Sequence, residues 1–162
     1  MDVKIKSNEC NFKMRVAGCL IKENKLLTVK ICDNDFYCLP GGHVHVGESS
    51  KDSIIREFKE EVNVTCNDIK LISITENFFL NKEKKKVHEI CYFYLVDTND
   101  EIEVKDYSCV ENDEGIMKNL EFKWIDLNAL KDANFRPNIL INKLMKKNYE
   151  FEHIIYDNEI KK

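Results

Sequence analysis

Residues 40–64 constrain the fold of this chain more than any other segment does. They begin with Pro40-Gly41-Gly42, a sequence in which a helix and a regular strand both fail. From residue 49 the pattern changes to a helical period, and one apolar stripe runs along the segment, made by Ile54, Ile55, Phe58 and Val62. A helix of this kind must bury its stripe, so the segment predicts a tight loop followed by a packed amphipathic helix.

Both ends of this helix carry their own signals. Ser49 and Asp52 resemble an N-terminal capping pair. Asn63 stands where the chain would take the left-handed conformation that ends a helix, because Asn tolerates positive φ better than other non-glycine residues do. We therefore expect a helix over residues 49–62 that stops at Asn63.

Most of the remaining chain consists of strand-like runs. They are rich in β-branched, aromatic and other apolar residues and cover residues 12–21, 25–31, 69–80, 87–96 and 120–125. Only three residues separate the first two runs, which predicts a hairpin.

The other segments predict little further regular structure. A second helix is expected at residues 138–145, whereas the polar and acidic residues 97–118 predict a loop with at most a short element. No repeat or linker interrupts the pattern. The sequence therefore predicts a single domain over residues 1–162, with its core at about 10–148 and a charged, frayed tail at 149–162.

Composition limits the classes of function. With 25 basic and 29 acidic residues the net charge is −4, which argues against a nucleic-acid coat and a polybasic membrane binder. The N-terminus alternates charged and apolar residues, and the longest apolar run, 90–96, is too short to span a membrane. Seven cysteines without CxxC spacing indicate reduced core thiols. We expect a cytoplasmic protein that binds neither nucleic acid nor membrane.

Three carboxylates gather on one face of the predicted helix. Glu57, Glu60 and Glu61 follow each other at i, i+3 and i+4, and Arg56 can pair with Glu60 one turn later. The excess of negative charge suits a hard divalent cation such as Mg²⁺ or Mn²⁺, to which a Gly41 carbonyl could add an oxygen ligand. The alternative for this pattern is a solvated acidic helix face.

The same segment matches a longer motif. It follows G-x5-E-x7-R-E-U-x-E-E-x-G-U, where U is a bulky apolar residue, and the matching residues are Gly42, Glu48, Arg56, Glu57, Phe58, Glu60, Glu61 and Val64. This is the Nudix box, and the chain resembles the Nudix hydrolase family. Asn63 replaces the family's glycine, a change that we expect to cost modest stability and to leave the site intact.

The resemblance implies a fold and an activity. The implied fold is an α+β, α/β/α sandwich in which a mixed β-sheet is flanked by the box helix and a C-terminal helix. The implied activity is metal-dependent cleavage of a diphosphate linkage in a nucleoside diphosphate derivative, by water attack at phosphorus. A non-catalytic Nudix-type domain that binds a nucleotide or metabolite and regulates a partner is the alternative, and an isomerase on the same fold is a further rival.

The resemblance also implies roles for individual residues. Glu57, Glu60 and Glu61 resemble the metal carboxylates, with Gly41 as a further ligand through its carbonyl. Arg56 resembles the residue that orients the carboxylates, so that Arg56, Glu57 and Glu60 are expected to act in catalysis.

Other positions are expected to contact the substrate or to support the site. Glu48 and Asn63 are structural positions of the box, while Arg15, Gly42 and His43 are placed to contact the substrate. The general base is either a box glutamate or a carboxylate of the acidic loop, where we favour Glu114 over Glu111 and Asp113. A solvated turn is the alternative for that loop.

The expected partner is a small nucleotide, either a nucleoside triphosphate or a nucleoside diphosphate sugar. Residues 76–80 lack the proline that marks many ADP-ribose-specific members of the family. The acidic chain needs bound metal to hold a polyphosphate. The sequence is compatible with a monomer or a homodimer.

Overall fold

The computed structural model of the 162-residue chain describes residues 1–32, 34–113 and 115–157. These residues form nine strands: β1 Lys4–Ile5, β2 Cys10–Lys22, β3 Lys25–Ile31, β4 Gly41–His43, β5 Asp68–Leu80, β6 Lys86–Asp97, β7 Tyr107–Asp113, β8 Ile116–Asp126 and β9 Glu152–Asp157. Helix α1 spans Ser50–Glu57 and continues into a π-helical turn, Phe58–Val62. Helix α2, Ile141–Met145, follows two short 3₁₀ helices, Leu127–Asp132 and Asn138–Leu140.

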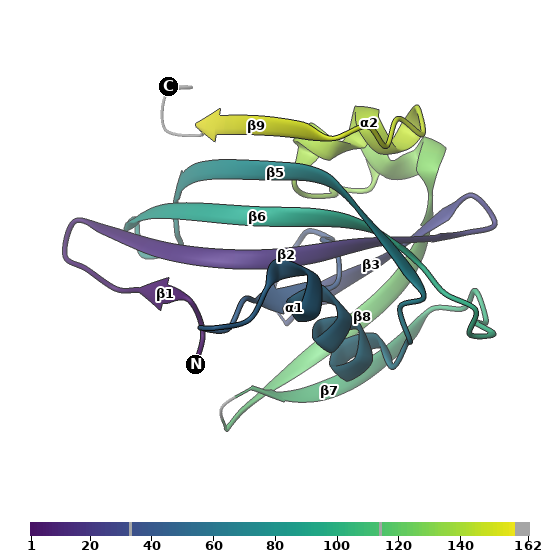
Figure 1. Ribbon diagram of the computed structural model, residues 1–162, viewed down its shortest axis with the longest axis horizontal. Helices are drawn as coiled ribbons and strands as arrows, with labels where there is room; N and C mark the ends of the chain where they lie inside the picture. The colour runs from purple at the N-terminus through teal and green to yellow at the C-terminus, as the bar shows by residue number, and fades with distance from the viewer. Residues whose placement is uncertain (33, 114, 158–162) are drawn as a thin grey trace.

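The strands belong to one mixed sheet (Figure 1). Its order is β7-β8-β3-β2-β6-β5-β9, and β1 and β4 also pair with β2. The β2–β6 and β5–β9 pairs are parallel, whereas the other neighbours are antiparallel. The sheet therefore has the mixed character that the sequence predicted.

The sheet opens between β2 and β3. These two strands pair only next to their hairpin turn, at Ile21–Leu26 and Lys22–Lys25. Beyond it, β4 takes the edge of β2, and Cys38 exchanges two backbone hydrogen bonds of 2.8 Å with Val29 on β3. The segment leading into α1 thus spans the gap between the two diverging strands.

Helices cover both faces of the sheet. One buried cluster includes Ile54 and Phe58 of the α1 segment together with sheet residues, and a second includes Leu130 and Leu144 from the C-terminal helices. Figure 1 shows α1 in front of β2, near the centre of the view, and α2 at the upper right, near β5 and β9. The predicted α/β/α sandwich is confirmed.

A glycine on β2 lets the helix approach the sheet. The Phe58 ring, which is fully buried, lies so close to Gly18 that a Cβ at this position would overlap it. The buried stripe differs from the predicted one, because Ile54 is fully buried while Ile55 is 37% exposed. Ile54 and Phe58, four residues apart, share the buried face, and Ile55 lies one position around the helix from it.

The predicted ends of the helix are confirmed. The Ser49 side chain accepts a hydrogen bond from the Asp52 backbone N–H, and Asn63 ends the π-helical turn in the left-handed conformation, with φ of 56° and ψ of 38°. The expected hairpin also forms, with its turn at Glu23 and Asn24, both of which have positive φ.

The prediction of a loop at 97–118 is wrong in its second half, where β7 and the start of β8 form a hairpin. Strand β7 lies at the edge of the sheet and is largely exposed, so it carries no alternating apolar pattern. Backbone pairing with β8 makes it a strand. The prediction that residues 40–42 exclude a strand is also wrong, because Gly41–His43 pairs with β2.

The C-terminal part departs from the prediction too. Residues 152–157 of the expected frayed tail form β9, which pairs with β5 from Ser73–Glu152 to Phe78–Asp157. The helix expected at 138–145 is a 3₁₀ turn followed by a five-residue α-helix.

All seven cysteines are free, but only Cys19 and Cys91 are buried. Within the described residues, no helix is long and apolar enough to cross a membrane.

The left-handed conformation of Asn63 predicts how substitutions there change the free energy of unfolding. Asn63→Gly should leave the free energy of unfolding unchanged or slightly raise it, since glycine adopts this conformation without a Cβ penalty. Asn63→Val should lower it by about 1–2 kcal/mol, because a β-branched residue is strained there. Chemical denaturation of the two variants beside the unmodified protein measures both effects, and a valine variant as stable as the parent would contradict the assignment.

Candidate active site

The two glycines of the loop bring the backbone against the helical carboxylates. The Gly41 N–H donates a 2.8 Å hydrogen bond to Glu61 Oε2. Gly41 has φ of +150°, and a Cβ there would collide with the Val16 carbonyl. A Cβ on Gly42 would overlap the Glu57 carboxylate. Only glycine at both positions allows this close approach.

Arg56 connects the acidic residues of the segment. Its Nε and Nη2 donate to the two carboxylate oxygens of Glu48, at 2.8 and 2.9 Å. Its Nη1 donates to Glu57 Oε1 at 2.6 Å and to Glu60 Oε2 at 3.3 Å, and Nη2 also reaches the His43 carbonyl at 3.1 Å. One guanidinium therefore fixes three carboxylates and the loop in a charge-assisted network.

The network sets the ionisation of its members. The hydrogen bonds from Arg56, with a further one from the His45 N–H, lower the pKa of Glu48 to about 2. The hydrogen bonds to Glu48 and Glu57 raise the pKa of Arg56 above its usual value. Glu48 is thus a permanent anion that holds a permanent cation.

Glu61 lies in a different environment from Glu48. Burial raises its pKa to about 8, and the negative charges of Glu111 on β7 and of Glu57 act in the same direction. Burial also raises the pKa of Glu57. The environment therefore disfavours the charged forms of Glu57 and Glu61, mainly through burial.

Arg15 on β2 borders these carboxylates. Its Nη2 lies 3.5 Å from the Gly41 carbonyl oxygen, and its buried Nε finds no hydrogen-bond partner among the described residues. Glu89 on β6 is the strongest opposite charge near Arg15 and pairs with Lys13 at 2.8 Å. Burial alone would raise the pKa of Glu89, but the charges of Arg15 and Lys13 hold it below the usual value.

His43 and His45 make contact with the N-terminal segment. His43 Nδ1 and His45 Nε2 lie 3.6 and 3.4 Å from the two carboxylate oxygens of Asp2. Burial, followed by the charge of Arg15, lowers the pKa of His43 to about 4, so the ring is neutral near pH 7.

The structure brings most of the predicted site residues together. Arg15, Gly41, Gly42, His43, Glu48 and the box residues Arg56, Glu57, Glu60 and Glu61 form one cluster. Glu114, the favoured general base, lies outside the described residues, as does the Asp113 side chain. Of the acidic loop, Glu111 is the carboxylate that approaches Glu61.

Sequence reasoning missed two contributors to this cluster. Glu89 could have been noticed, because it is a charged residue within the otherwise apolar run from Val87 to Val96. Asp2 carries no sequence signal, since only the folding of the N-terminal segment onto the loop places it beside the two histidines.

Comparisons with known proteins identify the family of the chain. The chain matches the NUDIX domain model over residues 12–143. It belongs to the Nudix family. It is 40% identical over 52 residues to an ADP-ribose pyrophosphatase of Methanocaldococcus jannaschii, covering 30% of this chain and 31% of that protein. It is 30% identical over 97 residues to a probable DHNTP pyrophosphohydrolase of Lactococcus lactis, covering 56% of this chain and 57% of that protein.

The chain therefore spans less than two thirds of the length of these curated relatives. Its fold is also similar to that of a MutT protein from Bacillus halodurans, with a TM-score of 0.66 at 12% identity over 92% of this chain and 93% of that chain. At this level of identity the likeness establishes the Nudix fold alone.

The depressed pKa of Glu48 gives a pH-dependent prediction. A folded-state pKa of about 2 against an ordinary value of 4.5 stabilises the protein above pH 4.5, and this contribution is lost as the pH falls toward 2. Glu48→Gln should thus destabilise by about 1–2 kcal/mol at neutral pH and progressively less in acid. Urea denaturation across this pH range measures the difference between the two proteins.

Glu83→Gln is the matched control for this experiment. Glu83 is exposed in the turn between β5 and β6, so its change should have a negligible effect on unfolding throughout the range. A Glu48→Gln effect that stayed constant with pH would contradict the ionic character of the pair with Arg56.

Proposed function

We propose that this Nudix protein is a divalent-metal-dependent pyrophosphohydrolase that cleaves the diphosphate linkage of a nucleoside diphosphate derivative. The observation that carries the proposal is the Arg56-centred cluster, in which Glu48 binds the arginine through both oxygens, Glu57 and Glu61 lie against the glycine loop, and Glu60 contacts Arg56. The names of the two relatives, an ADP-ribose pyrophosphatase and a probable DHNTP pyrophosphohydrolase, support the same class of reaction.

The side chains present suit a hard cation. Glu57, Glu60, Glu61 and the Gly41 carbonyl offer only oxygen ligands, which Mg²⁺ and Mn²⁺ prefer. Burial is the main cause of the raised pKa values of Glu57 and Glu61, and neighbouring carboxylates add to it, so a cation bound beside them would favour their charged forms. No three carboxylate, imidazole or thiol groups of the described residues stand close enough to hold a metal without side-chain rotation.

Glu60 is the carboxylate that is free to rotate. Glu60 is held by Arg56 at 3.3 Å and is 61% exposed, so it can turn from the arginine toward Glu57. When bound, a divalent cation would polarise phosphoryl oxygens and lower the pKa of a nearby water. Arg56 would meanwhile keep Glu57 in place against Gly42, which leaves the second oxygen of Glu57 for the metal.

Other residues would bind the substrate and accept the proton. The positive charge of the Arg15 guanidinium can attract a phosphate group, and Glu89 and Gly41 keep this guanidinium beside the carboxylates. Gly42 and the neutral His43 border the same space. For the proton of the attacking water, Glu111 joins Glu114 and the box glutamates as a candidate, because it lies near Glu61.

A Nudix domain that only binds a nucleotide and regulates a partner is the second candidate. Such a domain would retain the fold but would not need all four glutamates of the box. This chain keeps each charged position of the box, and Arg56 engages three of its four carboxylates directly. The complete set favours the enzyme.

One kinetic experiment tests both the metal requirement and the role of the carboxylates. With Mg²⁺, the protein should release a nucleoside monophosphate from nucleoside diphosphate derivatives or triphosphates, and a chelator should abolish this. Glu60→Gln and Glu61→Gln should each lower kcat by at least ~10²-fold, because each removes a ligand that stabilises charge in the transition state. Steady-state kinetics on a panel of nucleotides, with Mg²⁺ and with Mn²⁺, measures these effects.

Glu83→Gln again provides the control and should retain the parental kcat. Monophosphates should be inert, since cleavage requires adjacent phosphoryl groups. Full activity in the presence of the chelator would refute the metal requirement. A kcat/KM below ~10² M⁻¹s⁻¹ for the whole panel would favour the binding domain, because evolved enzymes usually exceed ~10⁴ M⁻¹s⁻¹.

A further inference from the structure

Strand β9 lies outside the part of the chain that matches the family. The Nudix domain model covers residues 12–143, whereas β9 begins at Glu152. It pairs in parallel with β5 and is the last strand of the sheet order, at the end opposite β7 (Figure 1). Its outer side has no strand partner among the described residues, so β9 presents a row of backbone donors and acceptors.

The inner side of β9 is held by side chains as well as by backbone pairing. Ser73 Oγ donates a 3.0 Å hydrogen bond to the Glu152 carbonyl, and Lys143 Nζ lies 3.6 Å from the Glu152 carboxylate. His153 Nε2 lies 2.9 Å from Glu76 Oε1 on β5. The open edge therefore belongs to a strand with a defined position on the domain.

The sequence of β9 does not protect this edge from pairing. Native edge strands are commonly blocked by Lys, Pro or a β-bulge. Strand β9 reads Glu-His-Ile-Ile-Tyr-Asp, without Lys or Pro, and its pairing with β5 runs without a register shift. Ile155 is 67% exposed, more than any other large apolar side chain of the described residues except Met1. Such an edge suits pairing with a further strand.

Strand β9 is self-complementary in an antiparallel pair. When Ile155 lies opposite the same residue of a second copy, His153 lies opposite Asp157 and Ile154 lies opposite Tyr156. The first of these pairs joins a basic and an acidic side chain, and the second joins a β-branched and an aromatic side chain. Both are favourable cross-strand pairs, and the twofold symmetry of the dimer forms each of them twice.

The backbone is compatible with this register. In an antiparallel ladder, alternate residues direct both backbone groups to the same side. Either the two copies of Ile155 therefore bond to each other, or Ile154 of each copy bonds to Tyr156 of the other. A centre between Ile154 and Ile155 would instead place Glu152 opposite Asp157, and like charges directly opposite each other are destabilising.

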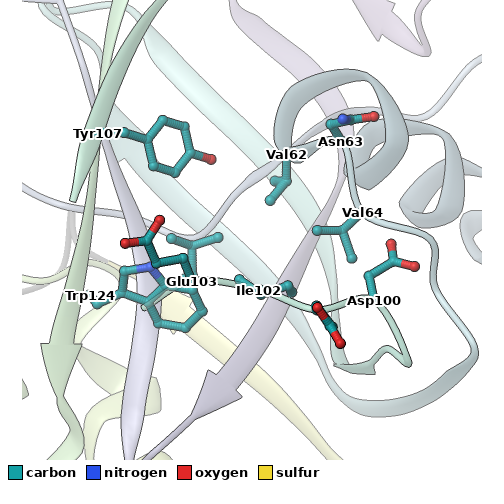
Figure 2. Close-up of a pocket in the computed structure, with 10 residues that line it drawn as sticks. Val62, Asn63, Val64, Asp100, Ile102, Glu103, Tyr107 and Trp124 are labelled. Atoms are coloured by element: carbon teal, nitrogen blue, oxygen red, sulfur yellow. The ribbon is translucent and has the colours of Figure 1, made fainter. Parts of the chain in front are cut away.

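The other edge of the sheet has a different environment. Figure 2 shows Tyr107 of β7 beside the cavity at the end of the box helix. Glu111 of the same strand acts on the charge of Glu61, and β7 contains no basic residue that could oppose Glu111 in a pair of two β7 strands. Of the two edges, β9 is the self-complementary one.

We propose that two copies of this chain form a symmetric dimer in which their β9 strands pair antiparallel about Ile155, so that the sheet continues from one copy into the other. A pair of six-residue strands buries a small area, and interfaces of this size are weak, so we expect a dissociation constant on the order of micromolar. The dimer goes beyond the proposed function, because β9 contributes no residue to the Arg56-centred cluster.

Sedimentation velocity from roughly 1 to 200 µM should show a reversible monomer–dimer equilibrium. Ile155→Lys should raise the dissociation constant at least ~10-fold, because it removes the central apolar contact and places two like charges opposite each other. Ile116→Lys is the matched control. Ile116 is 65% exposed at the start of β8, so this change should leave the equilibrium unaltered.

A cysteine at the centre of the pair tests the register. Ile155→Cys places two thiols directly opposite each other, at a Cα separation of about 4.5–5.5 Å that permits a disulfide. Mild oxidation should link this variant into a covalent dimer on a non-reducing gel. The unmodified protein, whose Cys32 and Cys109 are exposed, and the variant Ile116→Cys should remain unlinked.

Three results would overturn the proposal. They are a monomer at every concentration, a dimer that Ile155→Lys and Ile116→Lys weaken equally, and a dimer that Ile155→Cys does not cross-link. Thermal melts check that the variants are folded, as the exposure of both side chains leads us to expect. If none of these proteins hydrolyses a nucleotide, the proposed function fails while the dimer stands.

Discussion

The hydrogen bonds of the Arg56 guanidinium are the interaction on which the rest of the site depends. Four box glutamates lie within a short segment, and like charges at this density would drive the helix and its preceding loop apart. Arg56 binds both oxygens of Glu48 and one oxygen each of Glu57 and Glu60, and it also reaches the His43 carbonyl. The loop and the helix are thus held together by one cation.

The sheet leaves room for the glycine loop that faces these carboxylates. Because β2 and β3 pair only beside their turn, the loop that carries Gly41 and Gly42 can pass between them and pair with both sides. The close contact of Phe58 with Gly18 fixes the height of the helix above β2. Packing of an apolar ring therefore positions carboxylates that lie on the other side of the same helix.

Residues distant in sequence complete the surroundings of the box. Arg15 comes from β2, Glu89 from β6 and Glu111 from β7, and each acts on Glu61 or on its neighbours through charge. The hairpin of β7 and β8 also brings Tyr107 and Trp124 to the far end of the helix. The same short helix thus borders an acidic cluster on one side and an apolar cavity beyond its last turn.

The sequence alone determined the local features, and the tertiary structure decided those that depend on contacts between strands. Neighbouring residues determine both ends of the helix, at Ser49 and Asn63, as well as the hairpin and the long central strands. They also determine the acidic cluster of the box, so the sequence pattern predicts all of these features. Edge strands β7 and β9 were not predicted, because hydrophobic periodicity reports burial whereas an exposed strand is defined by backbone pairing. The placement of Glu89 beside Arg15 and of Asp2 beside His43 required the register of the folded sheet. No local pattern encodes which side chains meet across it.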